Sequence, residues 1–485
     1  MLEPAYQADV VIVGAGVAGL SAAHRLTSAG VTTAVLEAAH GVGGRMSTEK
    51  VDGFRLDRIG QLLSTAYPEL RLTPGLDGLV LRPFAPGVLL HSDGRHHRAG
   101  ATPANSGNAA WSVTRSVRSA RSTRSTRSTR SARGALHAVR ALASAPRPAP
   151  RPTPRPAPRP TAAPRSGTAP LGTAVDQARL GAALARIAGA PVERLLARPE
   201  LPAAQALAAR GLPARTIDGF LRPLLAALLC DPELTTSSRC ADLALRAFAG
   251  GLLSVPEGGA EVLPELLARS LPPGTVHTGV RVTSVSTNTV TTAEHGEFRC
   301  RAVLLATDAR AAAELLPGLR VPDFHPVTVV HHTTDEPPET GTALLLDADR
   351  GGPVAHTAVV SRVDPSRAPA GRALISSTVL GPPPPDVETA VRMHLARLYG
   401  TSTSRWETLA VHHTAEAVPT MRAPHDLRRP VRLLAGLYVC GDHRDTSTVQ
   451  GALHSAHRAT TALLSDLGAR GSMHRADPLP ATRAA

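Results

Sequence analysis

A glycine pattern near the amino terminus constrains the fold of this chain more than any other feature. Val10–Val13 is an apolar run without alternation, which is typical of a strand buried on both faces of a parallel sheet. Gly14, Gly16 and Gly19 follow it in the spacing G-x-G-x-x-G. There the first glycine permits a tight turn, the second lets the backbone approach a pyrophosphate, and the third lets a helix pack closely on the strand. The sequence therefore predicts a strand, a turn and a helix whose amino terminus binds a dinucleotide.

An acidic residue after the second expected strand supports this interpretation. Thr33–Leu36 reads as that strand, and Glu37 follows it, where a carboxylate can accept hydrogen bonds from ribose hydroxyls. The same acid disfavours a 2′-phosphate, so NADP is the least expected ligand. This stretch alone does not distinguish NAD from FAD as the ligand.

A second glycine cluster follows within a few residues. The segment GVGGRMST, Gly41–Thr48, resembles the E-x(n)-GGR-x-x-S signature of the flavoprotein superfamily that contains monoamine and polyamine oxidases, phytoene desaturases and protoporphyrinogen oxidase. This resemblance implies FAD as the cofactor. It also implies that Gly43, Gly44 and Arg45 lie along the FAD diphosphate and ribityl chain.

The carboxyl-terminal part of the chain carries a matching motif. An apolar strand, Leu437–Cys440, meets Gly441 and Asp442 and is followed by a helix start. The arrangement is similar to the superfamily's G-D-x(n)-GA-x-x-S-G motif. The resemblance implies that the aspartate binds the ribityl or diphosphate part of FAD and that the helix amino terminus faces the flavin ring, where its dipole stabilises negative charge. The residues that take these places are Asp442, Val449, Gln450, Gly451 and Ala452.

Stretches in the middle of the chain fit the same superfamily. Val255–Leu271 resembles its P-x-GG-x-x-x-L helix entry, and Val280–Thr292 alternates like a pair of strands. By the resemblance, the first of these strands offers backbone contacts to adenine near Val282. Cys300–Ala309 reads as a buried strand that ends at a polar turn.

No residue of the chain is assigned a catalytic role at this point. A bound flavin accepts a hydride without requiring a dedicated acid or base from the protein. Four residues are candidates for the neighbourhood of the ring, each more readily explained as a structural or flavin contact than as a proton carrier: Gly60, Gln61, His443 and Gln450.

These features predict an α/β fold, in which a Rossmann-like FAD-binding domain of the GR2 type is joined to a discontinuous α+β substrate domain. The FAD-binding domain is expected to comprise residues 1–70, 256–320 and 431–468, and the substrate domain residues 71–100, 171–255 and 321–430. Asp176–Leu229 has the periodicity of amphipathic helices. Residues 320–430 carry alternating β-branched residues, Thr357–Val363 among them, and read as a mixed sheet with one helix at Val387–Tyr399. Residues 469–485 are expected to form a disordered tail.

The net charge of +14 comes from one low-complexity insert, residues 101–170. Residues 115–165 hold 13 arginines and no acid, which leaves 40 basic residues against 39 acidic ones elsewhere. Three interpretations stay open. The insert is a solvated, mostly disordered linker, it makes weak electrostatic contact with an anionic membrane or nucleic acid, or it is a segment controlled by phosphorylation.

The first expected strand begins so early that it leaves no room for a signal peptide, and no run of 18 apolar residues is present. The four cysteines form no C-x-x-C pair and suggest a reducing compartment. We therefore expect a cytoplasmic protein, with peripheral attachment to a membrane as an open alternative.

Histidines are numerous, 20 in all, but their spacing does not predict a metal centre. The neighbours His331 and His332, like His412 and His413, point to opposite faces of a strand. His454 and His457 share a helical face but lack a third ligand in the pattern. No metal site is therefore expected.

The expected activity is hydride transfer from a small or apolar substrate to the flavin, with dioxygen or a quinone as the electron acceptor. Many amine oxidases of the superfamily place a lysine and aromatic rings near the flavin. Here the single lysine is Lys50, and the segment Gly441–Ala452 has no ring except His443. A desaturase-like oxidation of an isoprenoid-type compound is therefore favoured. An amine oxidase that uses dioxygen, and a non-catalytic flavin-binding protein tethered by its arginine-rich insert, are the alternatives.

Overall fold

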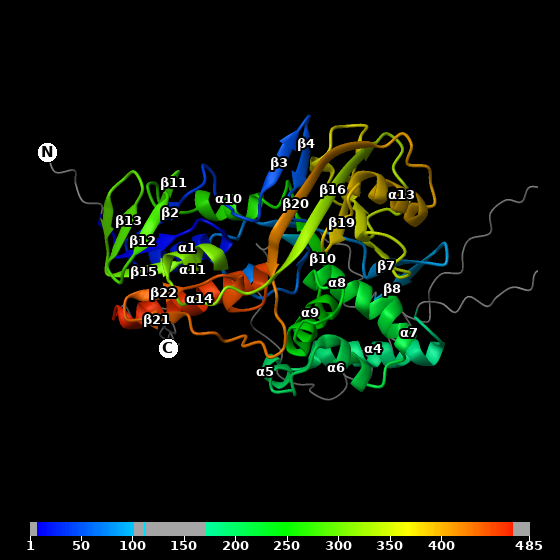
Figure 1. Cartoon of the computed structure of the whole chain (residues 1–485), viewed down its shortest axis with the longest axis horizontal. Coiled ribbons are helices and arrows are strands. Elements are labelled where there is room, and N and C mark those ends of the chain that lie inside the picture. Colours follow the sequence, from blue (N-terminus) through cyan, green and yellow to red (C-terminus); the bar gives the residue numbers. More distant parts are fainter. Residues whose placement is uncertain (1–6, 101–110, 113–170, 469–485) are drawn as a thin grey trace, which may run out of the picture.

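The computed structural model describes residues 7–100, 111–112 and 171–468, which form two large sheets, three smaller ones and the helices that cover them (Figure 1). The predicted insert, apart from Trp111–Ser112, and the predicted tail lie outside the described residues. The predicted domain boundaries stay a prediction.

The first sheet has six strands, and β1 lies near its centre. Four other strands of the sheet run parallel to β1, and the last strand, β21, is antiparallel. The strand order is β11 (Val276–Thr278), β2 (Thr33–Glu37), β1 (Val10–Val13), β15 (Ala302–Leu305), β22 (Leu437–Val439) and β21 (Arg432–Leu434).

Both faces of this sheet are covered, as the unbroken apolar run of β1 predicts. Val10 and Ile12 pack in one apolar cluster with the helices α1 (Val17–Ser28), α10 (Val262–Arg269) and α14 (Val449–Asp466). Val11 and Val13 pack on the opposite face against a three-stranded antiparallel sheet. That small sheet consists of β12 (Val282–Val285), β13 (Thr289–Thr292) and β14 (Glu297–Arg299). The predicted α/β fold is confirmed.

The second sheet has seven strands. One of its faces packs against α13 (Val387–Tyr399), whose bounds agree with the predicted helix. The strand order is β20 (Glu407–Pro419), β16 (Phe324–Thr334), β19 (Ala373–Leu380), β18 (Val354–Val359), β17 (Leu345–Asp347), β7 (Val88–Ser92) and β8 (Arg95–Ala99). The β-branched stretch Thr357–Val363 forms the end of β18 and then the short helix α12 (Val360–Val363).

A helical layer, drawn below this sheet in Figure 1, shares an apolar cluster with β7 and with residues around β17. Its members are α4 (Ala174–Gly189), α5 (Val192–Leu196), α6 (Ala203–Ala209), α7 (Ala214–Thr216), α8 (Arg222–Leu229) and α9 (Ser238–Gly250), with a π-helical segment at Ile217–Leu221. This confirms the helices predicted over Asp176–Leu229.

Smaller elements link the two sheets. They are the hairpin β3 (Thr48–Val51) and β4 (Phe54–Asp57), the helices α2 (Glu69–Leu72) and α11 (Ala309–Leu315), and a four-stranded sheet of β5 (Leu63–Ser64), β10 (Leu253–Pro256), β6 (Val80–Pro83) and β9 (Trp111–Ser112). Within the described ranges, every helix is too short or too polar to cross a lipid bilayer.

A buried arginine joins three of these segments. The Arg367 side chain is 1% exposed, and its guanidinium lies 2.9 Å from an Asp57 carboxylate oxygen on β4 and 3.0 Å from one of Asp364. It also donates to the Pro256 carbonyl at the end of β10, while Asp364 accepts from the Gly258 amide. A buried charge is tolerated only when paired and hydrogen-bonded, and Arg367 meets this condition.

We expect Arg367→Leu to lower the free energy of unfolding by about 3–5 kcal/mol, because it leaves two carboxylates without their cation. Urea unfolding would measure the change. The matched control is Arg405→Leu, whose ion pair with Glu336 is solvent-exposed and should contribute less than about 1 kcal/mol. Equal effects of the two substitutions would contradict a special role for the buried arginine.

Candidate functional site

A cavity of about 560 Å³ opens at the carboxyl ends of β1, β2, β15 and β22. In open parallel sheets this edge is where ligands bind. The cavity brings together predicted site residues from the two ends and the middle of the chain. Those that line it are Gly14, Gly16, Glu37, Gly43, Gly44, Arg45, Gln61, Val282, Gly441, Asp442 and Val449.

The three glycines of the first motif have different surroundings. Gly14 adopts φ +104°, a conformation that favours glycine. A Cβ added to Gly19 would stand 2.0 Å from the Gly14 carbonyl oxygen, so Gly19 permits the close packing of α1 on β1. A Cβ on Gly16 would meet nothing within 4 Å of protein, and Gly16 lines the cavity. The open space at Gly16 is what a close-lying pyrophosphate requires.

The acid predicted to contact ribose is held firmly in place. Glu37 accepts a hydrogen bond from the Ala15 amide at 2.7 Å through one oxygen and from the Ala39 amide at 2.9 Å through the other. Each carboxylate oxygen has two lone pairs, so each retains capacity to accept from a ligand hydroxyl.

An ion pair connects the second glycine cluster to the carboxyl-terminal motif. The Arg45 guanidinium lies 2.6 Å from Asp442 Oδ1, and it also donates to the Ala417 carbonyl at 2.9 Å. All three residues line the cavity. Charge-assisted hydrogen bonds of this kind fix orientation, so the pair holds two distant chain segments against the same ligand space.

Helix α14 directs its amino terminus at the cavity. Thr448 caps the helix by accepting from the Gly451 amide at 3.1 Å, and Thr448, Val449 and Ala452 line the cavity. The positive end of the helix dipole therefore faces the ligand space. Gly451 itself does not line the cavity. It is needed for packing, since a Cβ there would stand 1.9 Å from the Thr446 carbonyl oxygen.

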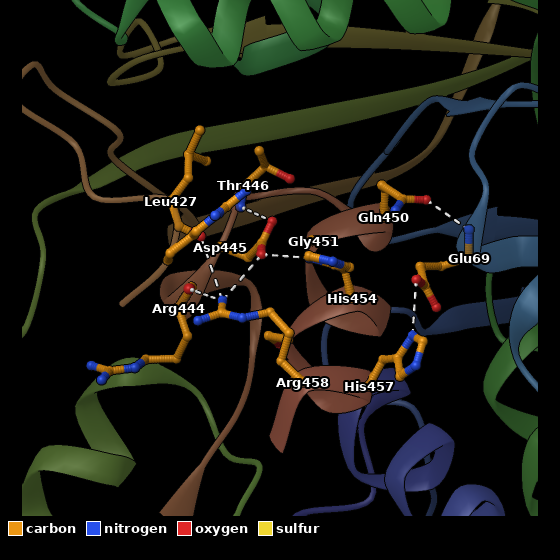
Figure 2. A network of polar contacts seen from close by, with 12 residues as sticks. Glu69, Leu427, Arg444, Asp445, Thr446, Gln450, Gly451, His454, His457 and Arg458 are labelled. Atoms are coloured by element: carbon orange, nitrogen blue, oxygen red, sulfur yellow. Dashed lines mark hydrogen bonds and ion pairs between the residues drawn. The ribbon is translucent and has the colours of Figure 1, made fainter. Parts of the chain in front are cut away.

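Gln450 does not line the cavity, and its side chain reaches toward Glu69 (Figure 2). Its amide oxygen accepts from the Glu69 backbone N–H at 3.0 Å, and the Glu69 carboxylate accepts from His457 at 3.3 Å. On the same helix His454 donates to Asp445 at 2.8 Å, and this hydrogen bond raises the pKa of His454. The expectation that Gln450 lies near the ring is therefore not supported, because its side chain fastens α14 to α2.

Two further candidates also lie outside the first cavity. His443 is buried and lines neither cavity described here, and its burial lowers its pKa to about 4. Gly60 lines a second, smaller cavity, which shares Gln61 with the first. Gln61 therefore marks the point where the two cavities adjoin.

Apolar side chains form much of the second cavity. They come from the seven-stranded sheet, the four-stranded sheet and the segments next to them, and they are Leu62, Phe84, Val255, Val329, Leu344, Ala358 and Val360. The second cavity has a volume of about 40 Å³ and adjoins the large cavity on the side of the seven-stranded sheet.

The polar groups of the second cavity carry no uncompensated charge. Burial lowers the pKa of both His331 and His356 to about 4, so both are neutral near pH 7. His331 donates through Nε2 to the Asp57 carbonyl at 3.1 Å and lies 2.9 Å from the Ser376 hydroxyl. Asp57, which supplies the only carboxylate among the lining residues, is paired with Arg367.

Several cavity residues were missed by reasoning from the sequence. Among the missed lining residues are Arg281, Thr283, Asp308, Glu314 and Ala417. Asp308 lies at the polar turn that ends the predicted buried strand, so the sequence pattern could have identified it as a site residue. Ala417 carries no comparable signal, because it enters the cavity only through the pairing of β20 with β16.

Comparison with known proteins gives a consistent result. A family model described as flavin containing amine oxidoreductase matches residues 17–464. A putrescine oxidase of Kocuria rosea is 53% identical over 68 residues, which are 14% of this chain and 14% of that protein. A carotenoid 3,4-desaturase of Haloarcula japonica is 51% identical over 49 residues, 10% of each protein. The matched stretches thus span only a small part of these relatives.

Solved structures share the fold over nearly the whole chain. A putative protoporphyrinogen oxidase from Exiguobacterium sp. 255-15 superposes with a TM-score of 0.61 and 16% identity, covering 96% of this chain and 99% of that one. At this level of identity the likeness shows the fold and no more.

The two glycines Gly16 and Gly19 provide a matched test of the site. We expect Gly16→Ala to leave the stability of the cofactor-free protein unchanged but to weaken flavin binding about tenfold or more, near 1.4 kcal/mol, because its methyl group occupies ligand space. Gly19→Ala should instead lower the stability of the cofactor-free protein by about 1–3 kcal/mol through overpacking. Flavin titration and thermal unfolding would measure both. Unchanged flavin affinity in Gly16→Ala would place the ligand elsewhere.

Proposed function

The chain belongs to the flavin containing amine oxidoreductase family, whose members are flavin-dependent oxidoreductases, and from this premise we propose its cofactor and substrate class. The cofactor is FAD. The reaction is a desaturase-like, two-electron oxidation of an apolar substrate, with an isoprenoid-type compound as the favoured class and dioxygen or a quinone as the electron acceptor.

The residues of the large cavity fit FAD. Gly16 would leave room for a pyrophosphate, Glu37 keeps lone pairs for ribose hydroxyls, and Arg45, although paired with Asp442, keeps further N–H donors that would hold a phosphate. When bound, the flavin ring supplies hydride acceptance. The protein contributes the cradle, and the amino terminus of α14 contributes a positive dipole that favours negative charge on the ligand.

The single observation that carries the substrate proposal is the neutrality of the second cavity. An ammonium group would lose hydration there without gaining a free carboxylate, since Asp57 is already paired with Arg367. The single lysine is not available to the site either. Lys50 is 59% exposed, pairs with Glu261 at 2.9 Å and lines neither cavity. An apolar compound needs no such partners, and the apolar walls lower the free energy of its burial.

The similarity to a putrescine oxidase supports the alternative of an amine oxidase that uses dioxygen. The similarity to a carotenoid desaturase supports the favoured class. A third candidate, a flavin-binding protein without turnover, predicts that no substrate reduces the flavin.

Anaerobic reduction of the purified protein tests these candidates together. We expect an oxidised-flavin absorption spectrum and release of FAD on denaturation. Apolar polyenes or other isoprenoids should reduce the bound flavin and so bleach its visible absorption. Putrescine should reduce the flavin at least about a hundredfold more slowly, which corresponds to an activation barrier higher by about 2.7 kcal/mol. Bleaching by the diamine alone would establish the amine oxidase instead, and bound flavin that neither class reduces would favour the non-catalytic candidate.

We also propose that residues 115–165 make weak contact with an anionic membrane or nucleic acid. Their 13 arginines without an acid support this, because such contacts depend mainly on charge. The full chain should bind anionic vesicles or DNA at low salt and release them as salt rises. A variant of equal length with all 13 arginines replaced by glutamine should not bind. Equal binding by the wild-type chain and this variant would indicate that the segment is a passive linker.

A further inference from the structure

Three potential metal ligands meet at one end of the seven-stranded sheet. His91 lies on β7 and Asp347 ends β17, and the two are register partners on neighbouring parallel strands, so their side chains share one face. Asp349 follows two residues later. The nearest ligand atoms of the three, His91 Nδ1, Asp347 Oδ1 and Asp349 Oδ2, all lie within 4.8 Å of one another.

The distances suit a shared ion better than hydrogen bonds. His91 Nδ1 lies 3.8 Å from Asp347 Oδ1 and 3.6 Å from Asp349 Oδ2, both beyond hydrogen-bond range. Two ligand atoms about 2.0–2.2 Å from one tetrahedral ion stand about 3.3–3.6 Å apart. The distances from His91 Nδ1 to the two carboxylate oxygens therefore need only a small contraction for all three residues to coordinate a single cation.

The imidazole of His91 is unpartnered although it is buried. Its residue is 2% exposed, and neither ring nitrogen has a hydrogen-bond partner among the described residues. A buried polar group without a partner costs about 1–3 kcal/mol. Because Nδ1 is directed at the two carboxylates, a cation between them would satisfy it.

The carboxylate of Asp347 is oriented through both oxygens, and Oδ1, which accepts from the Asp349 amide at 3.1 Å, keeps its second lone pair for the cluster. Its Oδ2 accepts from the Gly351 amide at 2.7 Å and lies 3.1 Å from His394 Nε2 and 3.5 Å from an Arg397 nitrogen. Its Oδ1 faces His91. Arg397 therefore neutralises part of the acidic charge from the far side of Asp347, while a cation would neutralise the rest.

Asp349 is held by the turn that follows β7. Its Oδ1 accepts from the Ser92 hydroxyl at 2.9 Å and its Oδ2 from the Asp93 amide at 2.9 Å. Such outer contacts orient ligands in metal sites. The Asp349 side chain is 33% exposed, against 3% for His91 and 2% for Asp347, so solvent reaches the cluster from one side.

We propose that His91, Asp347 and Asp349 bind a divalent transition-metal ion, with Zn²⁺ as the favoured ion and a solvent molecule as its fourth ligand. One imidazole nitrogen with two carboxylate oxygens is a set that Zn²⁺ accepts, whereas Mg²⁺ and Ca²⁺ prefer oxygen alone. The three residues line neither of the two cavities, so the site is separate from the flavin site. The ion would join the β7–β8 hairpin to the segment after β17.

The test uses the full, untagged, flavin-loaded chain after removal of metals with a chelator. Calorimetric titration with ZnCl₂ should give one ion per chain. Asp349→Asn should weaken that binding about tenfold or more, whereas Asp93→Asn, the same change of charge on the adjoining turn, should leave it unchanged. The flavin spectrum of each variant verifies that it is folded.

Two further readouts complete the test. A crystal grown with Zn²⁺ should show an anomalous peak between the three ligand atoms, and Zn²⁺ should raise the Tm of the wild type but not of Asp349→Asn. A wild type that binds no stoichiometric Zn²⁺ overturns the proposal. Equal Zn²⁺ affinity in Asp349→Asn also overturns it, because the ion is then bound by other histidines. Displacement of Zn²⁺ by an equal concentration of Mg²⁺ overturns it as well.

Discussion

The architecture depends on one constraint, the parallel sheet that has β1 near its centre. Parallel strands cannot be joined by tight turns, so each return to the sheet requires a crossover. The parallel strands of this sheet lie between residues 10 and 439, and the seven-stranded sheet and the helical layer are built within the crossovers. Because the parallel strands end at one edge, distant segments of the chain contribute to a single cavity there.

The cavity is completed by contacts that only this arrangement permits. Arg45 and Asp442 are brought together by the pairing of β1 with β15 and of β15 with β22, and their ion pair then fixes the two glycine-containing segments relative to each other. The outer side of α14 is fastened by Gln450 and His457 to Glu69, so the helix end that faces the cavity is held in direction as well as in position. A rigid, pre-oriented dipole interacts with a ligand without the cost of reorganisation.

The features that could be predicted from the sequence are those that short-range physics determines. The strand at Val10–Val13, the glycine turn after it and the helix Val387–Tyr399 follow from local periodicity and backbone freedom. The direction of the Gln450 side chain could not be predicted in this way, because it depends on the position of α2 against α14. The grouping of His91 with Asp347 depends likewise on the register of β7 with β17, and the spacing of histidines in the sequence does not reveal that register.

The charge distribution around Gln61 links the stability of the fold to the chemistry of the site. On one side the large cavity presents charged and strongly polar groups, which suit a nucleotide. On the other side Arg367 neutralises Asp57 and Asp364, and burial keeps His331 and His356 uncharged. The same guanidinium therefore holds β4, β10 and the second sheet together and removes the one carboxylate that could attract a cation to the second cavity. A change that freed Asp57 to receive an amine would also remove the buried pairing at this junction, so the proposed preference for apolar compounds and the packing of the junction depend on the same buried side chain.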